Sequence, residues 1–234
     1  MTRRLRNRLT AAGLDAWATI LPTECSGCGA LDRALCPSCR LALRPAVHPV
    51  TRDDALVWAA LTYEGVARHV IGAYKDGGRT DAAAALAAPL RAAIAAALTA
   101  VPSVNGGGIR LVTIPSSRRA WRLRGYHPVD ALLQRAGLHP VPALAQRGES
   151  VDQVGLGRAA RAANKGNSLV ARHPLTGTRV ILVDDIVTTG ATLLEARRAV
   201  FAAGGTVVGL ATLAETRRLL PPYSHSGQTD RQIL

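Results

Sequence analysis

The sequence predicts an α/β protein with an open, mainly parallel sheet, and three observations support this class. Apolar runs of strand length alternate with segments of helical length between positions 56 and 213. The run Val180–Val183 is continuous and branched, as is typical of a strand buried on both faces of a parallel sheet, and a polar turn and a helix-like segment follow it. All four cysteines precede these elements in one short segment, so we expect one domain with a small amino-terminal appendage.

Composition and charge limit the classes of partner. Only Lys75 and Lys165 among the 29 basic residues are lysine, and the formal net charge is +13. Such a chain attracts polyanions, which makes nucleic acid a candidate partner. The positive charge has two alternative origins, since arginine content also follows genome composition and a pyrophosphate site needs cations. Aromatic residues make up only 3% of the chain, so few platforms exist for stacking single-stranded nucleic acid.

The two ends of the chain are expected to lie outside the main domain. Residues 1–20 are basic and predict an amphipathic helix or leader that packs loosely on the body rather than binding a membrane. Polar residues interrupt the apolar positions of 9–21, so the continuous apolar stretch of a signal peptide is missing. We therefore expect a cytoplasmic protein without a membrane partner. Residues 217–234 predict a disordered tail.

The cysteines form two pairs with metal-binding spacing. Cys25 and Cys28 are separated by two residues, as are Cys36 and Cys39, and all four fall within the segment 21–52. Two such knuckles supply four thiolates to one tetrahedral Zn²⁺, and four protein ligands leave no open position for a water, so the role is structural. Because the spacer between the pairs is short, redox pairs or disulfides remain alternatives.

The first predicted strand and helix of the main domain lead to Lys75. Residues 57–63 read as a strand and residues 66–74 as a helix that stops at Gly77 and Gly78. Lys75 lies where this helix meets a flexible loop. It either reaches a pyrophosphate or complements the carboxyl end of the helix, and local sequence favours neither reading.

A second strand ends in a hydroxyl-rich and basic segment. An alanine-rich helix over 81–100 is followed by a strand candidate over 109–114. Ser116 and Ser117 come next, and four arginines begin at Arg118. At the end of a strand, these residues suit a diphosphate through backbone N–H groups and fixed cations. A solvated basic face is an equally good interpretation.

The segment between this element and the last strands contains a candidate lid. Residues 129–136 predict a short helix and residues 141–145 a third strand. The long polar stretch 147–172 has no clear apolar period, which is typical of a mobile loop that closes over substrate. Its candidate contact residues are Gln153, Arg161 and Asn164. The helix 193–203 and a final strand over 207–213 complete the domain.

The turn after Val180–Val183 carries the strongest chemical indication. Asp184 and Asp185 end the apolar run, and three threonines and a glycine follow before the next helix. Ligands of open parallel sheets bind at the carboxyl ends of the strands, and the start of a helix offers N–H groups to a phosphate. Two acids repel a phosphate but suit ribose hydroxyls or a hydrated Mg²⁺ beside it. The inferred ligand is therefore a sugar phosphate, against the plainer alternative that these residues only cap the strand and the helix.

The segment 180–190 resembles the phosphoribosyl pyrophosphate (PRPP) motif of type I phosphoribosyltransferases. Further pieces are similar to the ComF family, which is associated with competence and DNA uptake: the cysteine pairs, a Tyr-x-Gly-x-x-Arg segment starting at Tyr63, an Arg-Gly-Tyr turn starting at Arg124, and spaced Gln, Leu, Arg and Asn residues between 153 and 164. The resemblance covers about Cys25 to Thr216. The turn departs from the family because His127 and Pro128 stand where an Asn and a Gln are usual, and the segment near 116 is less apolar than expected. Both differences concern substrate specificity.

The resemblance implies a type I phosphoribosyltransferase fold over 53–216 that binds PRPP with Mg²⁺. Asp184, Asp185 and Lys75 are implied as catalytic residues. The implied PRPP-binding residues are Val187, Thr188, Thr189, Gly190, Ala191, Thr192, Ser116, Ser117 and Arg118. The protein then transfers or senses the phosphoribosyl group. The alternative is a non-enzymatic accessory protein for DNA uptake or processing that binds nucleic acid through its basic surface. The acceptor and the oligomeric state, a dimer among the options, stay open.

Overall fold

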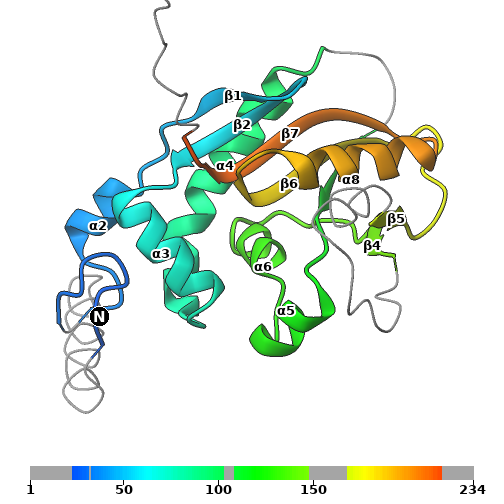
Figure 1. The fold of residues 1–234 in the computed structure, drawn as a ribbon. Coiled ribbons are helices and arrows are strands. Elements are labelled where there is room, and N and C mark those ends of the chain that lie inside the picture. Colours follow the sequence, from blue (N-terminus) through cyan, green and yellow to red (C-terminus); the bar gives the residue numbers. More distant parts are fainter. Residues whose placement is uncertain (1–22, 32, 103–107, 148–167, 218–234) are drawn as a thin grey trace, which may run out of the picture.

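The computed structural model describes residues 23–31, 33–102, 108–147 and 168–217. Its main feature is a five-stranded sheet with the strand order β1-β2-β7-β6-β3 (Figure 1). The strands are β1 (His48–Arg52), β2 (Ala55–Thr62), β3 (Ile109–Thr113), β6 (Arg179–Val187) and β7 (Thr206–Glu215). β2, β7, β6 and β3 run parallel, and β1 pairs antiparallel with β2 at one edge. The predicted open, mainly parallel sheet is confirmed.

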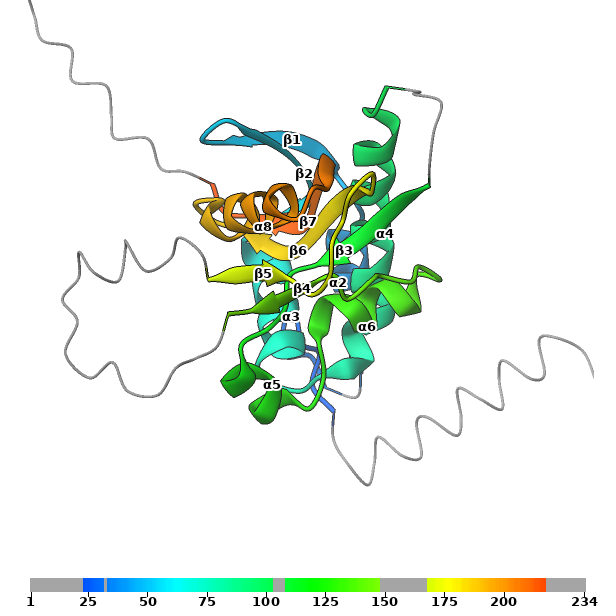
Figure 2. The ribbon, with the colours of Figure 1, turned by 90° about the vertical axis from the view of Figure 1, so that its right-hand side faces the viewer.

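Helices cover both faces of this sheet (Figure 2). α3 (Gly65–Lys75), α4 (Ala83–Thr99) and α6 (Pro128–Arg135) pack on one face, and α8 (Ala191–Ala202) packs on the other. Alternate residues of β6 serve the two layers: Ile181 belongs to the core under α4, and Leu182 belongs to the core under α8. Both side chains are fully buried, which explains why the sequence of this strand is apolar without alternation.

Several smaller elements complete the described chain. A short 3₁₀ helix, η1 (Thr80–Ala82), precedes α4, and α2 (Pro37–Ala42) follows the second cysteine pair. α5 (Arg118–Arg124) follows β3 and buries none of its side chains. β4 (Leu144–Gln146) and β5 (Leu169–Ala171) form a separate antiparallel pair beside α8.

The structure changes three of the expected elements. The strand expected over 141–145 lies at 144–146 and belongs to the small two-stranded sheet, so it is not a third strand of the main sheet. The basic segment after β3 is a helix, α5, because Ser117 caps its start and Gly125 ends it in a left-handed conformation. β1 was not expected, and it pairs with β2 in the main sheet although it precedes the domain boundary predicted at residue 53.

One helix of the described residues is long and apolar enough to cross a membrane. It spans Thr80–Thr99, and half of its most apolar window is buried inside the protein. Leu86, Leu90 and Ile94 are almost fully buried, and α4 contacts β2, β7 and α6. This pattern is that of a core helix covering a sheet, whose length and composition satisfy the same test.

Candidate functional site

The candidate site lies at the carboxyl ends of β3 and β6. These strands are neighbours in the sheet, yet the chain continues from β3 to α6 on one face and from β6 to α8 on the other. Such a change of direction leaves a crevice between the two strand ends. A cavity of about 330 Å³ occupies this place. It brings together the predicted site residues Lys75, Ser116, Ser117, Asp184, Asp185 and Thr192.

Asp184 and Asp185 lie inside β6, two residues before its end, rather than in the following loop. The Asp185 N–H donates to Asp184 Oδ1 at 2.8 Å, and the Ile186 N–H donates to Asp185 Oδ1 at 2.7 Å. Burial raises the pKa of Asp184 to about 7, and the charge of Asp185 acts in the same direction, while the Asp185 N–H and Lys75 oppose the rise. A cation placed beside this pair would therefore stabilise its charged form.

Lys75 is held at the acids. Its Nζ lies 2.5 Å from Asp185 Oδ2, and both side chains are largely buried. The end of α3 that carries Lys75 is tied to α6, because the Tyr74 hydroxyl donates to the Pro128 carbonyl at 2.9 Å. The Tyr126 hydroxyl in turn donates to the Tyr74 carbonyl. Lys75 thus supplies a fixed positive charge inside the cavity, where Asp185 is its partner.

The turn after β6 presents hydroxyls and the start of a long helix. Thr188, Thr189 and Thr192 are exposed, and Gly190 adopts φ +88° at the N-cap of α8. The Ala191 N–H is within 3.3 Å of Thr189 Oγ1. The first N–H groups of a helix have no acceptor inside the helix, which suits a phosphate at this position. Val187 differs from its neighbours because its side chain is buried in the core.

The segment after β3 supplies serines to the cavity, but its arginines are placed otherwise than the sequence suggested. Ser117 Oγ accepts the Ala120 N–H at 3.1 Å as the N-cap of α5. Arg118 is exposed and is not among the residues that line the cavity. Arg124 lines it instead, and its Nη2 donates to Asp76 Oδ1 at 2.8 Å. The fixed cation nearest to the serines therefore comes from the end of α5.

Two titratable residues of α6 and its N-cap were not predicted for this site. His127 and Asp130 line the same cavity, and Asp130 Oδ1 is buried without a hydrogen-bond partner among the described residues. Their spacing at the start of a helix is common, so only the fold reveals that they face the acids' cavity. The lid residues Gln153, Arg161 and Asn164 lie outside the described residues.

The largest cavity of the described structure lies elsewhere. It measures about 500 Å³ and lies between β5 and α8, where Leu169, Pro174 and Ala199 form part of its wall. It contains none of the predicted site residues, and its size alone assigns it no chemistry. The cavity at the strand ends is smaller but holds the charged and hydroxyl groups.

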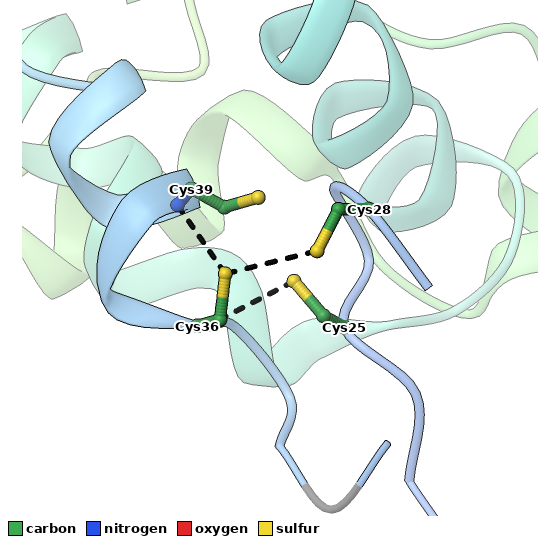
Figure 3. A group of neighbouring side chains, drawn as sticks. All are labelled: Cys25, Cys28, Cys36 and Cys39. Atoms are coloured by element: carbon green, nitrogen blue, oxygen red, sulfur yellow. Dashed lines mark hydrogen bonds between the residues drawn. The ribbon is translucent and has the colours of Figure 1, made fainter. Parts of the chain in front are cut away.

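The four cysteines converge on one point, as the sequence predicted (Figure 3). All four are free thiols, and their sulfurs lie within 4.8 Å of one another. Cys28 Sγ and Cys36 Sγ are 3.7 Å apart, close to the roughly 3.8 Å that two sulfurs show when both bind one tetrahedral zinc at about 2.3 Å. The donor set and its spacing therefore fit a structural zinc.

Backbone groups prepare the cysteines for this role. The Cys36 N–H donates to Cys25 Sγ at 3.3 Å, and the pKa of Cys25 falls to about 6, because such N–H donors outweigh the opposing effect of burial. A Cβ at Gly27 would lie 2.6 Å from Cys39 Sγ. Glycine is thus required where the first knuckle passes the second, and any larger residue would push the sulfurs apart.

Comparisons with known proteins agree with the cavity and the fold. Residues 128–226 match the family model of the phosphoribosyl transferase domain. The fold and this match define the class: the chain carries a phosphoribosyl transferase domain and is ComF-like, as the sequence indicated.

The particular relatives are two proteins called DNA utilization protein YhgH. The chain is 28% identical over 234 residues to that of Salmonella typhi, and the alignment covers 89% of this chain and 99% of the relative. The protein of Salmonella typhimurium is 28% identical over 232 residues with the same coverage. The likeness therefore extends over nearly the whole of both relatives.

Two crystal structures of adenine phosphoribosyltransferase also align with the chain. One is 16% identical over 76% of this chain and 89% of the other, with a TM-score of 0.37. The enzyme of Rhodothermus marinus is 23% identical over 76% of this chain and 86% of the other, with a TM-score of 0.34. At such scores the superposition does not transfer site residues or substrate, so the fold assignment rests on the strand order and the family match.

Proposed function

We propose that the protein binds Mg²⁺ and PRPP in the cavity between β3 and β6. The observation that carries the proposal is the sharing of one cavity by Asp184, Asp185 and Thr192 from the β6–α8 side and by Ser116 and Ser117 from the end of β3. The carboxylates suit ribose hydroxyls, the start of α8 suits the 5′-phosphate, and the serine segment suits the pyrophosphate. These groups follow the order of the chemical parts along PRPP.

We further propose that the bound phosphoribosyl group is transferred or sensed. In transfer, an acceptor nitrogen forms a bond to C1 of the ribose, the bond from C1 to pyrophosphate breaks, and pyrophosphate leaves with the electron pair. The acceptor then gives up a proton. Mg²⁺ would neutralise charge on the leaving pyrophosphate. The contribution of the chain is positioning and charge, which is sufficient for a reaction of this kind.

Lys75 and the α6 side of the cavity have separate roles in this proposal. Lys75 neutralises Asp185 in the free protein at 2.5 Å, and it can turn to a pyrophosphate oxygen once Mg²⁺ or ribose hydroxyls engage the acid. His127 and Asp130 are the titratable groups of the cavity wall on α6 and its N-cap. They are the candidates to orient the acceptor and to take its proton.

Calorimetry tests the binding step. Titration of the folded protein with PRPP in excess Mg²⁺ should give a saturable heat, and the same titration with EDTA should give a much smaller one. No heat at millimolar PRPP, with folding confirmed by circular dichroism, would contradict the proposal. Pyrophosphate release on addition of a panel of nitrogen bases and amines then separates an enzyme from a sensor.

A second candidate function, nucleic-acid binding, is favoured by α5. Arg118, Arg119 and Arg122 are exposed on this helix, and Trp121 lies between them with 48% of its surface accessible. Arginines beside an exposed aromatic ring suit single-stranded nucleic acid. The relatives' name, DNA utilization protein, agrees with this candidate.

Salt dependence tests the second candidate. Affinity for an oligonucleotide should fall steeply as salt rises, and replacement of the three α5 arginines by serine should reduce the slope. A flat salt dependence would speak against it. Both candidate functions suit the cytoplasm, which we propose as the location.

A further inference from the structure

We propose that Arg52 is a positioning residue that holds the turn Thr188–Gly190 in its phosphate-binding shape. The inference rests on the proposed function, because that turn is the proposed site of the 5′-phosphate. Arg52 ends β1, which is an edge strand separated from β6 by β2 and β7 in the sheet. It nevertheless contacts the turn directly, across 136 residues of sequence.

The guanidinium of Arg52 joins the turn to two other parts of the chain. Its Nε donates to the Thr188 carbonyl at 2.6 Å. Its Nη2 donates at 2.7 Å both to Glu215 Oε2 at the end of β7 and to the Thr216 carbonyl. Its Nη1 lies 3.2 Å from the Thr51 carbonyl. One side chain thus fixes the carbonyl at the start of the turn against the end of β7.

The stem of Arg52 also fits the shape of the turn. Gly190 has φ +88°, and a Cβ built on it would lie 2.6 Å from Arg52 Cβ. The turn therefore rests on the Arg52 side chain, and glycine is needed for that contact. Figure 2 shows the β1–β2 hairpin beside α8, and Arg197 of α8 pairs with Asp54 near the hairpin's tip at 2.8 Å.

Burial of this ion pair is costly, which calls for a reason beyond stability. Arg52 is 5% exposed and Glu215 is 6% exposed. Apolar residues of similar volume in place of a buried ion pair often leave stability unchanged or improve it. They cannot donate to the Thr188 and Thr216 carbonyls, however. The guanidinium supplies several donors in a fixed plane, which an apolar core or a lysine cannot reproduce.

A ligand that uses only one part of the site separates positioning from general support. Ribose 5-phosphate engages the acids and the turn Thr188–Gly190, whereas inorganic pyrophosphate engages the serine segment after β3. Loss of Arg52 frees the turn, so the affinity for ribose 5-phosphate should fall while the affinity for pyrophosphate stays. A role in overall stability alone would move both affinities together or neither.

Calorimetry with these two ligands is the test, on wild type, Arg52→Lys and the double variant Arg52→Met with Glu215→Leu. The double variant removes both charges, so that neither is left buried alone. We expect it to bind ribose 5-phosphate about tenfold or more weakly, the loss expected for a hydrogen bond to a charged group, and to bind pyrophosphate within about twofold of wild type. Arg52→Lys keeps the charge with fewer donors and should fall between the two. If the double variant does not fold, the same split between the ligands in Arg52→Lys decides the matter.

Asp54→Asn is the matched control. It breaks the ion pair between the hairpin tip and Arg197 without touching Thr188, so both affinities should remain at the wild-type value. Equal affinity for ribose 5-phosphate in wild type and the Arg52 variants would overturn the inference and leave the proposed function standing. A parallel loss of both ligands would also overturn it. A wild-type protein that binds neither PRPP nor ribose 5-phosphate would overturn the proposed function, and the inference with it.

Discussion

The cysteine cluster and the phosphate turn each depend on one glycine that a side chain would spoil. A Cβ at Gly27 would lie 2.6 Å from Cys39 Sγ, and a Cβ at Gly190 would lie 2.6 Å from Arg52 Cβ. In the cluster the partner belongs to the same short segment of chain. In the turn the partner comes from a distant edge strand.

This difference separates local from tertiary support. The cysteine cluster assembles from residues of one segment, so its spacing alone predicts its metal. The turn needs β1, the end of β7 and the turn itself to meet, and only the folded sheet produces that contact. The two sites should therefore fail independently, each through its own support.

The largest expected effect is on metal content in Cys36→Ser. Wild type should carry about one zinc per chain, and the variant should carry none after dialysis, because three thiolates and a weak hydroxyl ligand hold zinc poorly. The Mg²⁺-dependent affinity for PRPP of the folded fraction should change less than about threefold, given that a loss below about 0.7 kcal/mol is expected at a separate site. Metal analysis and calorimetry measure the two quantities. A wild-type protein that is fully folded and metal-free would contradict the zinc site.

The reverse pattern is expected for Gly190→Ala. An alanine at φ +88° costs about 1–2 kcal/mol and presses on Arg52, so the turn should shift and PRPP should bind about tenfold to a hundredfold more weakly. Zinc content should stay at the wild-type value. Gly177→Ala is the control, because Gly177 has φ +72° but open space around it. It should lose stability alone, and a loss of PRPP affinity there would count against the role of the turn.

A smaller effect concerns pH and Asp184. Its pKa in the folded protein is raised to about 7, so its contribution to stability is complete below its ordinary pKa near 4 and is lost as pH rises through about 7. Asp184→Asn removes this ionisation. The variant should therefore gain stability relative to wild type between about pH 5 and pH 8, by an amount of the order of 2–4 kcal/mol. Urea unfolding without ligand at several pH values measures the difference, and a constant difference would exclude the raised pKa.

The smallest effect is expected from Ser117→Ala. The change removes the N-cap of α5, which contacts little of the core, so global stability should change by less than about 1 kcal/mol. Pyrophosphate affinity should fall a few-fold, in line with the loss of one neutral hydrogen bond of about 1 kcal/mol. Ribose 5-phosphate affinity should be unchanged. Calorimetry with the two ligands shows whether the end of β3 serves the pyrophosphate alone.

The sequence predicted the parts of the site whose reasons are local. The apolar run of β6, the acids within it, the threonine turn and the cysteine pairs each state their role within a few residues. The sequence did not predict β1, since its alternation is short and its main contribution is the single residue Arg52. Nor did it predict that Arg124, rather than Arg118, lines the cavity, because the turn of α5 decides which arginine faces inward. The packing of α6 and α3 around the strand ends brings Asp130 into the cavity and decides between the two readings of Lys75.

The most direct test of the account is a calorimetric titration of PRPP with Mg²⁺ on wild type and on Asp184→Asn with Asp185→Asn. The double change keeps the shape of both side chains and removes the charges that hold the ribose and the metal. It relieves the burial of the Asp184 charge but leaves Lys75 without its ion-pair partner, and these two effects on stability oppose each other. The account predicts saturable binding to wild type, no measurable binding to the variant, and melting temperatures that agree within a few degrees. Equal binding by the two proteins would contradict it.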